Sequence, residues 1–282
     1  MLLLLGPALL YLVVFSIFPL VTSLVRSFQD YDTVHNTWRW IGVDNYSALV
    51  NSGAFWRVVE HTFTFTFATV TLQVVLGTAL ALFFNQRLRG ATLVRGILIM
   101  PMLLTPIVVG LMWRMLLNPS WGLVDWVFVE FGFHIQWLTD PSIALWTLVA
   151  ADTWQWMPFV FIIVYARLQA LPQDVFEASA VDGAGWFRRT WYVTLPLLMP
   201  AIVFAALFRG IDAFRTFDLV FGLTNGGPVQ ATTTLSYLAF QNGFEFQHYG
   251  YASAIAFVMV IIATVGMMLL FRVVNVRRED AT

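Results

Sequence analysis

Six long apolar stretches constrain this chain more than any other feature of its sequence. Each is long enough to cross roughly 30 Å of hydrocarbon, which takes about 20 residues of α-helix. A soluble protein could not bury them all, because 59% of the 282 residues are hydrophobic and only 11% are charged, against roughly 25% charged in average chains. The sequence therefore predicts an all-α polytopic membrane protein with six transmembrane helices. The predicted spans are Leu2–Val25, Thr62–Phe84, Leu93–Leu117, Ile143–Ala166, Leu197–Leu223 and Tyr251–Val274.

Two missing residue types limit the chemistry. The chain has no cysteine, which excludes disulfides, thiolate catalysis and cysteine-based metal sites. All 15 basic residues are arginine, so a P-loop lysine and a Schiff-base lysine are excluded as well. The four histidines do not have the spacing of a metal site. We therefore expect no catalytic residue, no metal and no cofactor in this chain; if ATP powers it, another chain must bind the ATP.

The arginines gather on one side of the predicted bundle. They cluster between spans two and three, between spans four and five, and after span six, whereas the segments Asn118–Ser142 and Thr224–Gly250 contain no basic residue. Only the loop after span one is mixed. Because basic loops stay in the cytoplasm, this pattern predicts that both termini are cytoplasmic. The clustered residues are Arg87, Arg89, Arg95, Arg167, Arg188, Arg189, Arg272, Arg277 and Arg278.

One of the two segments without basic residues is rich in tryptophan. Trp121, Trp126 and Trp137 lie within Asn118–Ser142, and tryptophan favours the headgroup level of a bilayer. A short interfacial helix is therefore predicted in this segment. No low-complexity run or internal repeat divides the chain, which favours a single domain over residues 1–282.

A polar hairpin interrupts the apolar sequence between spans four and five, over about residues 171–196. Pro172 can begin a helix, because the amide that it lacks would be unpaired in the first turn, and Gly183 can end that helix with a positive φ. A second short helix is predicted over Trp186–Val193. Leu195-Pro196 then directs the chain back into the membrane. Two short helices joined at a glycine corner form a rigid knob, which can fit a groove on a partner and transmit rigid-body motion.

The residues of this hairpin resemble a known signature. The string Glu177-Ala178-Ser179-Ala180-Val181-Asp182-Gly183 is followed after nine residues by Val193-Thr194-Leu195-Pro196. This order is similar to the Glu-Ala-Ala loop in the membrane subunits of bacterial ABC importers. Two departures, Ser179 for alanine and Val193 for isoleucine, are small.

Two further segments extend the resemblance over the C-terminal half. The turn Thr224-Asn225-Gly226-Gly227-Pro228 resembles the Thr-Gly-Gly-Gly-Pro turn of carbohydrate-type permeases in that family. Asn225 replaces one glycine of that turn, and asparagine also tolerates positive φ. The run from Phe244 to Ala254 is similar to the segment that precedes the last helix of those permeases.

The resemblance implies one half of a heterodimeric, maltose-type sugar permease with the type I importer fold. Its expected partners are a second homologous permease subunit, two ATP-binding subunits that hold ATP and Mg, an extracytoplasmic solute-binding protein and the lipid bilayer of the bacterial cytoplasmic (inner) membrane, and no nucleic acid. In that family the hairpin contacts the ATPase, where its glutamate pairs with a basic residue. The coupling residues implied are Glu177, Ala178, Ser179, Asp182, Gly183, Leu195 and Pro196, and the turn Thr224–Pro228 is expected to be periplasmic. An amphipathic surface hairpin with no partner is the alternative, and it leaves the full spacing unexplained.

Charged residues recur inside the predicted spans, where each costs roughly 2.5–3.5 kcal/mol on insertion scales. Arg209, Asp212, Arg215 and Asp218 follow every three residues along span five, so opposite charges can partly neutralise one another. One interpretation is a translocation path that binds a sugar or polyol, and the other is a structural ion-pair ladder, which is favoured for Arg215–Asp218. The candidate path residues are Asp152, Trp156, Arg209, Asp212 and Phe217.

Two other functions also fit the buried carboxylates. An intramembrane enzyme acting on a lipid-linked substrate, or an ion-coupled carrier, could use Asp152 and Asp212 without ATP. Neither gives the hairpin a role, and no inverted halves of the kind found in many carriers are present. The sequence therefore favours ATP-driven import of a sugar, polyol or related polar solute by alternating access. Maltose-like sugars, monosaccharides, polyols and glycerol phosphate all remain open as solutes.

Overall fold

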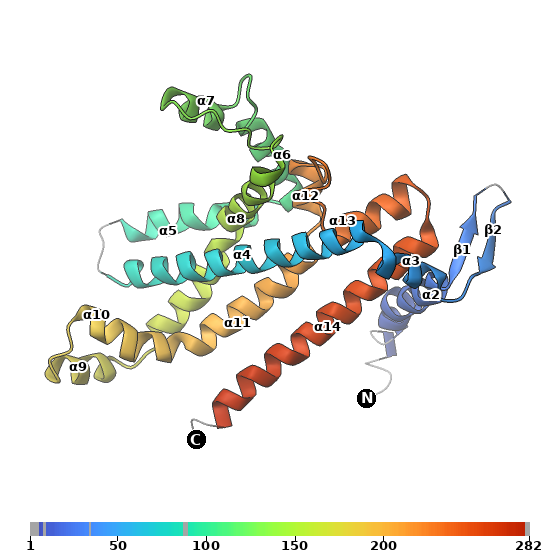
Figure 1. The fold of residues 1–282 in the computed structure, drawn as a ribbon. Coiled ribbons are helices and arrows are strands. Elements are labelled where there is room, and N and C mark those ends of the chain that lie inside the picture. The colour runs from blue at the N-terminus through green and yellow to red at the C-terminus, as the bar shows by residue number, and fades with distance from the viewer. Residues whose placement is uncertain (1–5, 8–9, 34, 87–89, 280–282) are drawn as a thin grey trace. The chain divides into compact units, whose positions relative to one another are not determined.

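The computed structural model describes residues 6–7, 10–33, 35–86 and 90–279 (Figure 1). The chain forms two compact units. The first comprises residues 1–62 and 233–282, and the second comprises residues 63–232. The single permease domain predicted over residues 1–282 would contain both units.

The six predicted spans have counterparts in the described part of the chain. Five helices are long and apolar enough to cross a membrane, and a bent pair of helices provides a sixth span. The fold class predicted from the sequence is confirmed, with changed bounds. The start of the first predicted span, at Leu2, lies outside the described residues, as do Arg87 and Arg89. The straight spans are Leu10–Ser27, Gly53–Phe84, Pro141–Gln169, Trp186–Phe214 and Tyr249–Gly266.

The first unit joins helices from both ends of the chain. Its last helix, α14, packs against α2, and the hydroxyl of Thr62 on α4 accepts a hydrogen bond from the amide of Leu235 at 3.0 Å. A two-stranded antiparallel sheet pairs Gln29 with Trp40, an element that the sequence did not predict. The elements are η1 (Val13–Ile17), α2 (Phe18–Ser27), β1 (Gln29–Asp32), β2 (Thr37–Trp40), α3 (Asp44–Asn51), the start of α4 (Gly53–Phe84), α13 (Leu235–Phe240), η4 (Gln241–Glu245) and α14 (Tyr249–Glu279).

The second unit is built around α4, α8 and α11 (Figure 1). Their shared core is apolar and includes Ala81, Val160, Phe161 and Leu198. The run of alternating threonine and phenylalanine that begins at Thr62 is helical, as its apolar surroundings predict. The elements are the rest of α4, α5 (Ala91–Ile99), η2 (Met100–Leu103), α6 (Pro106–Leu116), α7 (Leu123–Glu130), α8 (Pro141–Gln169), α9 (Gln173–Val181), α10 (Trp186–Arg189), η3 (Thr190–Thr194), α11 (Leu195–Phe214) and α12 (Asp218–Leu223).

Asp140 fixes the start of α8. Its carboxylate accepts hydrogen bonds from the hydroxyl and the backbone amide of Ser142, at 2.7 and 2.8 Å. An aspartate that caps the first turn in this way satisfies an amide that the helix leaves unpaired. The two hydrogen bonds, first that from the hydroxyl and then that from the amide, hold the pKa of Asp140 below its ordinary value.

The third predicted span is not straight. The helices Thr92–Leu103 and Pro106–Leu116 meet at 101°, because Pro101 and Pro106 each remove a backbone amide and Thr105 between them is extended. Pro158 lies inside α8 without breaking it. The expectation of one continuous helix over Leu93–Leu117 is therefore wrong.

The fifth predicted span ends earlier than expected. α11 stops at Phe214, and a separate helix, α12, begins at Asp218. The regular spacing of charges along one helix therefore extends only through Asp212, with Arg215 at the helix end. Neither glycine nor proline marks this boundary in the sequence.

After the boundary, α12 packs closely against α6. A Cβ on Gly222 would lie 2.8 Å from the carbonyl oxygen of Ile107 and 3.3 Å from Cα of Gly110. Likewise, a Cβ on Gly110 would lie 2.9 Å from the amide of Leu223. The two helices can approach this closely only because both positions are glycine.

Gly222→Ala is therefore expected to lower the stability of the protein by about 1–3 kcal/mol, the range for overpacked sites. Thermal unfolding of the detergent-solubilised protein measures this loss. Gly96→Ala is the matched control, since a Cβ there meets nothing within 4 Å, and alanine has the higher helix propensity. Equal stability of the two variants would contradict the close packing.

Candidate functional site

The hairpin after α8 has the predicted glycine corner. α9 ends at Val181, and Gly183 has a φ of +71°. The amide of Ala184 donates to the carbonyl of Ser179 at 3.0 Å, which is the six-residue closure of a Schellman motif. This closure turns the chain sharply and fixes the direction of α10 relative to α9.

One face of α9 is open to solvent. Glu177 and Ala178 are exposed, and the side chain of Val181, one turn after Glu177, is 88% exposed. Ser179 lies on the opposite face, buried, and its hydroxyl donates to the carbonyl of Phe176 at 2.8 Å. The packing of Ser179 therefore presents a carboxylate and apolar side chains together on the outer surface of the hairpin.

The second helix of the hairpin differs from the prediction. α10 begins at Trp186 as expected, but it continues through the π-helical turn η3 directly into α11. Pro196 comes just after η3, and the helix continues across it. Leu195-Pro196 therefore does not re-aim the chain, and the hairpin is joined rigidly to a membrane span.

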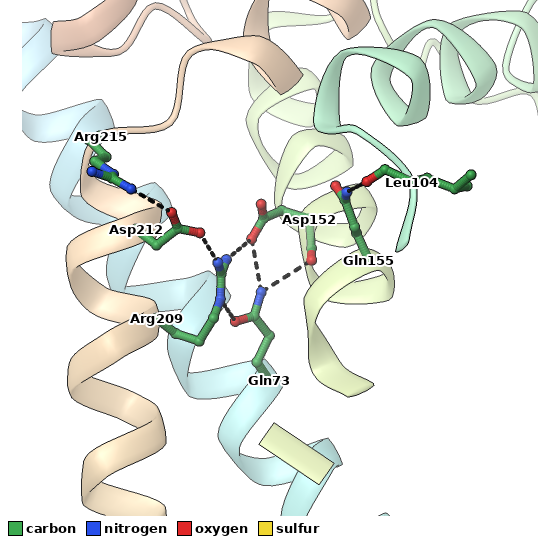
Figure 2. Close-up of polar contacts among 7 residues, drawn as sticks. All are labelled: Gln73, Leu104, Asp152, Gln155, Arg209, Asp212 and Arg215. Atoms are coloured by element: carbon green, nitrogen blue, oxygen red, sulfur yellow. Dashed lines mark hydrogen bonds and ion pairs between the residues drawn. The ribbon is translucent and has the colours of Figure 1, made fainter. Parts of the chain in front are cut away.

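A buried polar network connects three spans of the second unit (Figure 2). Arg209 on α11 and Asp152 on α8 have side chains only 1% and 4% exposed, and Gln73 on α4 is fully buried. Residues this polar are costly in a membrane unless they are paired. The three helices are therefore tied together at a single point.

Each nitrogen of the Arg209 guanidinium has an acceptor. Nη2 donates to Oδ2 of Asp152 at 2.9 Å, Nε donates to Oε1 of Gln73 at 2.9 Å, and Nη1 donates to Oδ2 of Asp212. Gln73 completes the ring, because its Nε2 donates to Oδ2 of Asp152 at 2.8 Å. The guanidinium also lies over the ring of Trp156, with Cζ 4.7 Å from the ring centroid.

The network has a buried end and an open end. Asp212 is 32% exposed, and its Oδ1 lies 3.5 Å from Nη2 of Arg215, a side chain 71% exposed. The two positive charges of Arg209 and Arg215 and the two negative charges of Asp152 and Asp212 formally cancel. The buried end suits the structural interpretation of the charges, whereas the open end at Asp212 is accessible to a solute.

The structure brings together four of the five candidate path residues: Asp152, Trp156, Arg209 and Asp212. Phe217 lies beyond the end of α11, where its ring stacks on Phe221. Asp218, expected on the same helix as Arg215, begins α12 instead. The ladder favoured for Arg215–Asp218 is therefore not a ladder along one helix.

Two glutamines of the site were missed by the sequence analysis. Gln73 is a lone amide in an apolar stretch, and this isolation was the available signal. Gln155, one turn after Asp152 on α8, donates through Nε2 to the carbonyl of Leu104 at 2.9 Å, in the break between η2 and α6 (Figure 2). The same face of α8 thus holds both the ion-pair network and the bent third span.

The two segments without basic residues, Asn118–Ser142 and Thr224–Gly250, also have defined local structure. α7 provides the helix predicted in the first of them, where Trp137 Nε1 donates to the buried carboxylate of Asp125 at 2.9 Å. In the second, Asn225 and Gly226 have φ values of +54° and +76°, which fits the predicted turn Thr224-Asn225-Gly226-Gly227-Pro228. Thr232 Oγ1 donates to the carbonyl of Gly227 at 2.6 Å and so braces the turn.

Within the described ranges, no three His, Asp or Glu side chains are grouped closely enough to hold a metal ion. His35 contacts a carboxylate nearby in the sequence, with its Nδ1 2.7 Å from Oδ2 of Asp32.

Comparison with known proteins identifies related sequences. A family described as the binding-protein-dependent transport system inner membrane component matches residues 73–279. The trehalose/maltose transport system permease protein MalF of Thermococcus litoralis is 35% identical over 97% of this chain and 92% of its own length. The sn-glycerol-3-phosphate transport system permease protein UgpA of Escherichia coli O157:H7 is 32% identical over 97% of this chain and 93% of its own length. The sulfoquinovosyl glycerol transport system permease protein SmoG of Agrobacterium fabrum is 32% identical over 98% of this chain and 90% of its own length.

Solved structures agree on the fold. A chain of a bacterial ABC transporter involved in the import of the acidic polysaccharide alginate superposes with a TM-score of 0.84, at 21% sequence identity, over 96% of this chain and 93% of that chain. The type I importer fold expected from the hairpin is therefore confirmed. From the family match and the relatives that align over almost its whole length, this chain belongs to the binding-protein-dependent transport system inner membrane components and is a multi-pass permease subunit of an ATP-driven ABC importer.

Proposed function

We propose that this chain is one half of a heterodimeric permease that imports a sugar, polyol or related polar solute. Two separate ATPase subunits hold ATP and Mg, and each permease half docks onto one of them through its hairpin. The observation that carries the proposal is the face of Glu177, Ala178 and Val181, which is exposed on a helix pair continuous with a membrane span. ATP-driven closure of the ATPase pair then moves the hairpin, and the hairpin moves α11. Asp182 and Gly183 maintain the corner, and Leu195-Pro196 lies at the junction with the span.

The solute class follows from what the relatives share. Trehalose, maltose, glycerol 3-phosphate and sulfoquinovosyl glycerol, the solutes in their names, are all rich in hydroxyl groups. In this chain the carboxylate of Asp212 is part-exposed beside Arg215. It is an acceptor that suits hydroxyl donors.

The proposed orientation puts both termini and the hairpin in the cytoplasm. It is supported by the arginines of the hairpin side, Arg167, Arg188 and Arg189, and by the absence of basic residues from Asn118–Ser142 and Thr224–Gly250. α7 and the turn at Thr224–Pro228 then face the extracytoplasmic binding protein. Loaded binding protein and ATP must both favour the outward-open state, because a ligand shifts such an equilibrium only through differential affinity.

Reconstituted transport tests the proposal. The complex, purified from its native membrane, is placed in vesicles with or without enclosed ATP, and uptake of labelled sugars and polyols is measured after addition of the native extracytoplasmic proteins. Uptake is expected to require both the enclosed ATP and those proteins. Uptake that needs neither would contradict the proposal.

Asp212→Asn is expected to weaken solute uptake without disturbing assembly. Asparagine keeps the Oδ1 acceptor and loses only the charge, which lowers the contribution of the hydrogen bond by about 1–1.5 kcal/mol. The solute concentration for half-maximal uptake should therefore rise roughly 5- to 10-fold. Asp218→Asn is the matched control, because Asp218 is exposed on α12 and outside the contacts of the Arg209 guanidinium. Equal effects of the two variants would exclude a particular role for Asp212.

A further inference from the structure

A cavity of about 600 Å³ lies between the C-terminal end of α4 and the hairpin. One wall comes from Leu82 on α4 and from Asn85 and Gln86, which directly follow α4. The other comes from Phe176 on α9 and from the stretch that starts at Trp186. The cavity is separate from the Arg209 network, with which it shares no residue.

The polar part of the cavity offers hydrogen-bond donors. Arg189 is one of its lining residues, and no ion pair joins Arg189 to a carboxylate among the described residues. Asn85 Oδ1 already accepts from Nε2 of Gln169 at 2.8 Å, which leaves the Asn85 amide group as a donor. Gln86 adds a second amide. Since no acidic side chain lines the cavity, its chemistry favours an anion.

The rest of the lining is apolar, and its position is that of a membrane interface. Leu82, Phe176 and Trp186 form this part, and Trp186 is exposed. The continuous helix Trp186–Phe214 has 29 residues, or about 43 Å at 1.5 Å per residue, which exceeds the roughly 30 Å of hydrocarbon. A helix of this length extends beyond the hydrocarbon, and the arginines of its first turn, Arg188 and Arg189, favour that end for the headgroup level.

We propose that this cavity binds a phosphate group with Arg189 as its charged partner and the amides of Asn85 and Gln86 as donors. The phosphate belongs to an anionic lipid headgroup or to a free organic phosphate. Basic pockets between membrane helices on the cytoplasmic side suit such headgroups, and the apolar wall suits the glycerol and acyl part of a lipid. Because α4 and both hairpin helices form the walls, a bound phosphate braces the hairpin against α4. This consequence for coupling rests on the proposed function, whereas the binding itself does not.

Binding of labelled phosphatidylglycerol tests the inference. The chain is purified together with the subunits that accompany it and is placed in phosphatidylcholine nanodiscs that contain a small fraction of labelled phosphatidylglycerol. The amount of labelled lipid that the protein retains is then measured. Arg189→Gln is expected to weaken retention at least 10-fold. Arg188→Gln is the matched control, because Arg188 is adjacent and exposed but does not line the cavity, and it should retain the lipid.

Competition identifies the source of the phosphate. Displacement of the lipid by millimolar glycerol 3-phosphate would assign the cavity to free organic phosphates, and resistance to it would assign the cavity to lipid; both outcomes support a phosphate site. Equal loss in Arg188→Gln and Arg189→Gln would overturn the inference, since charge alone would then explain retention. No loss in either variant would also overturn it, since Arg189 would then not hold the phosphate.

A second pair of variants keeps the test independent of Arg189. Gln86 is exposed at the cavity wall, so either charge is tolerated there by the fold. Gln86→Glu is expected to weaken phosphate binding several-fold, and Gln86→Lys is expected to strengthen it. Identical binding in these two variants would exclude the site. ATPase recovered with each variant is recorded separately, so failure of coupling is distinguished from failure of binding.

Discussion

Glu177→Arg is expected to separate this subunit from its ATPase while its membrane helices stay folded. Glu177 is exposed on α9, so its replacement removes no buried contact. At the interface, arginine would place a positive charge against the basic residue expected on the ATPase. Loss of one partner from a buried charge pair costs about 2–5 kcal/mol, and like-charge repulsion adds to this, so ATPase recovery should fall at least 30-fold.

The measurement is the amount of ATPase that copurifies with the tagged chain from native membranes. Glu130→Arg is the matched control, since it makes the same charge reversal at an exposed position at the end of α7, outside the hairpin. Recovery of the ATPase is expected to be unchanged in this control. Equal recovery in Glu177→Arg and wild type would remove Glu177 from the docking face.

Arg209→Met is expected to produce the largest loss of stability. It leaves the carboxylate of Asp152 buried beside Gln73 without its cation, and breaking a buried pair by removing one partner costs about 3–5 kcal/mol. Unfolding in mixed micelles of increasing denaturing detergent measures the change. A loss below about 1 kcal/mol would mean that the network does not hold α4, α8 and α11 together.

The double variant Asp152→Leu/Arg209→Met separates pairing from packing. Replacement of a whole buried pair by apolar residues is often neutral, so the double variant is expected to be more stable than Arg209→Met alone. Asp212 remains part-exposed and can be solvated. Additive losses from the two substitutions would show that Asp152 and Arg209 contribute separately.

The hairpin was predictable from sequence because its determinants are local. A positive-φ glycine at Gly183, small residues before it and a proline at Pro172 define the corner within a dozen residues. The spans were predictable for a similar reason, since hydrophobic length alone determines whether a helix can cross a bilayer. The π-helical join into α11 was missed because a proline in the first turn of a helix has the same sequence pattern as a proline after a helix end.

The site and the helix breaks depend on contacts distant in sequence. Gln73 and Arg209 are 136 residues apart, and neither residue alone indicates the other. The bend at Leu104 is held by Gln155 from another span, and the close contact of α12 with α6 requires the fit of Gly222 to α6. Prolines indicated where the third span could bend, whereas neither proline nor glycine marked the end of α11.

The composition of the native complex is the most direct test of the central claim, that this chain is a permease half driven by a separate ATPase. The tagged chain is extracted in mild detergent, and the proteins that accompany it are identified and their ratio is measured. The account predicts one copy of this chain, one homologous permease subunit and two ATPase subunits. A chain that purifies alone and transports a solute without ATP would contradict it.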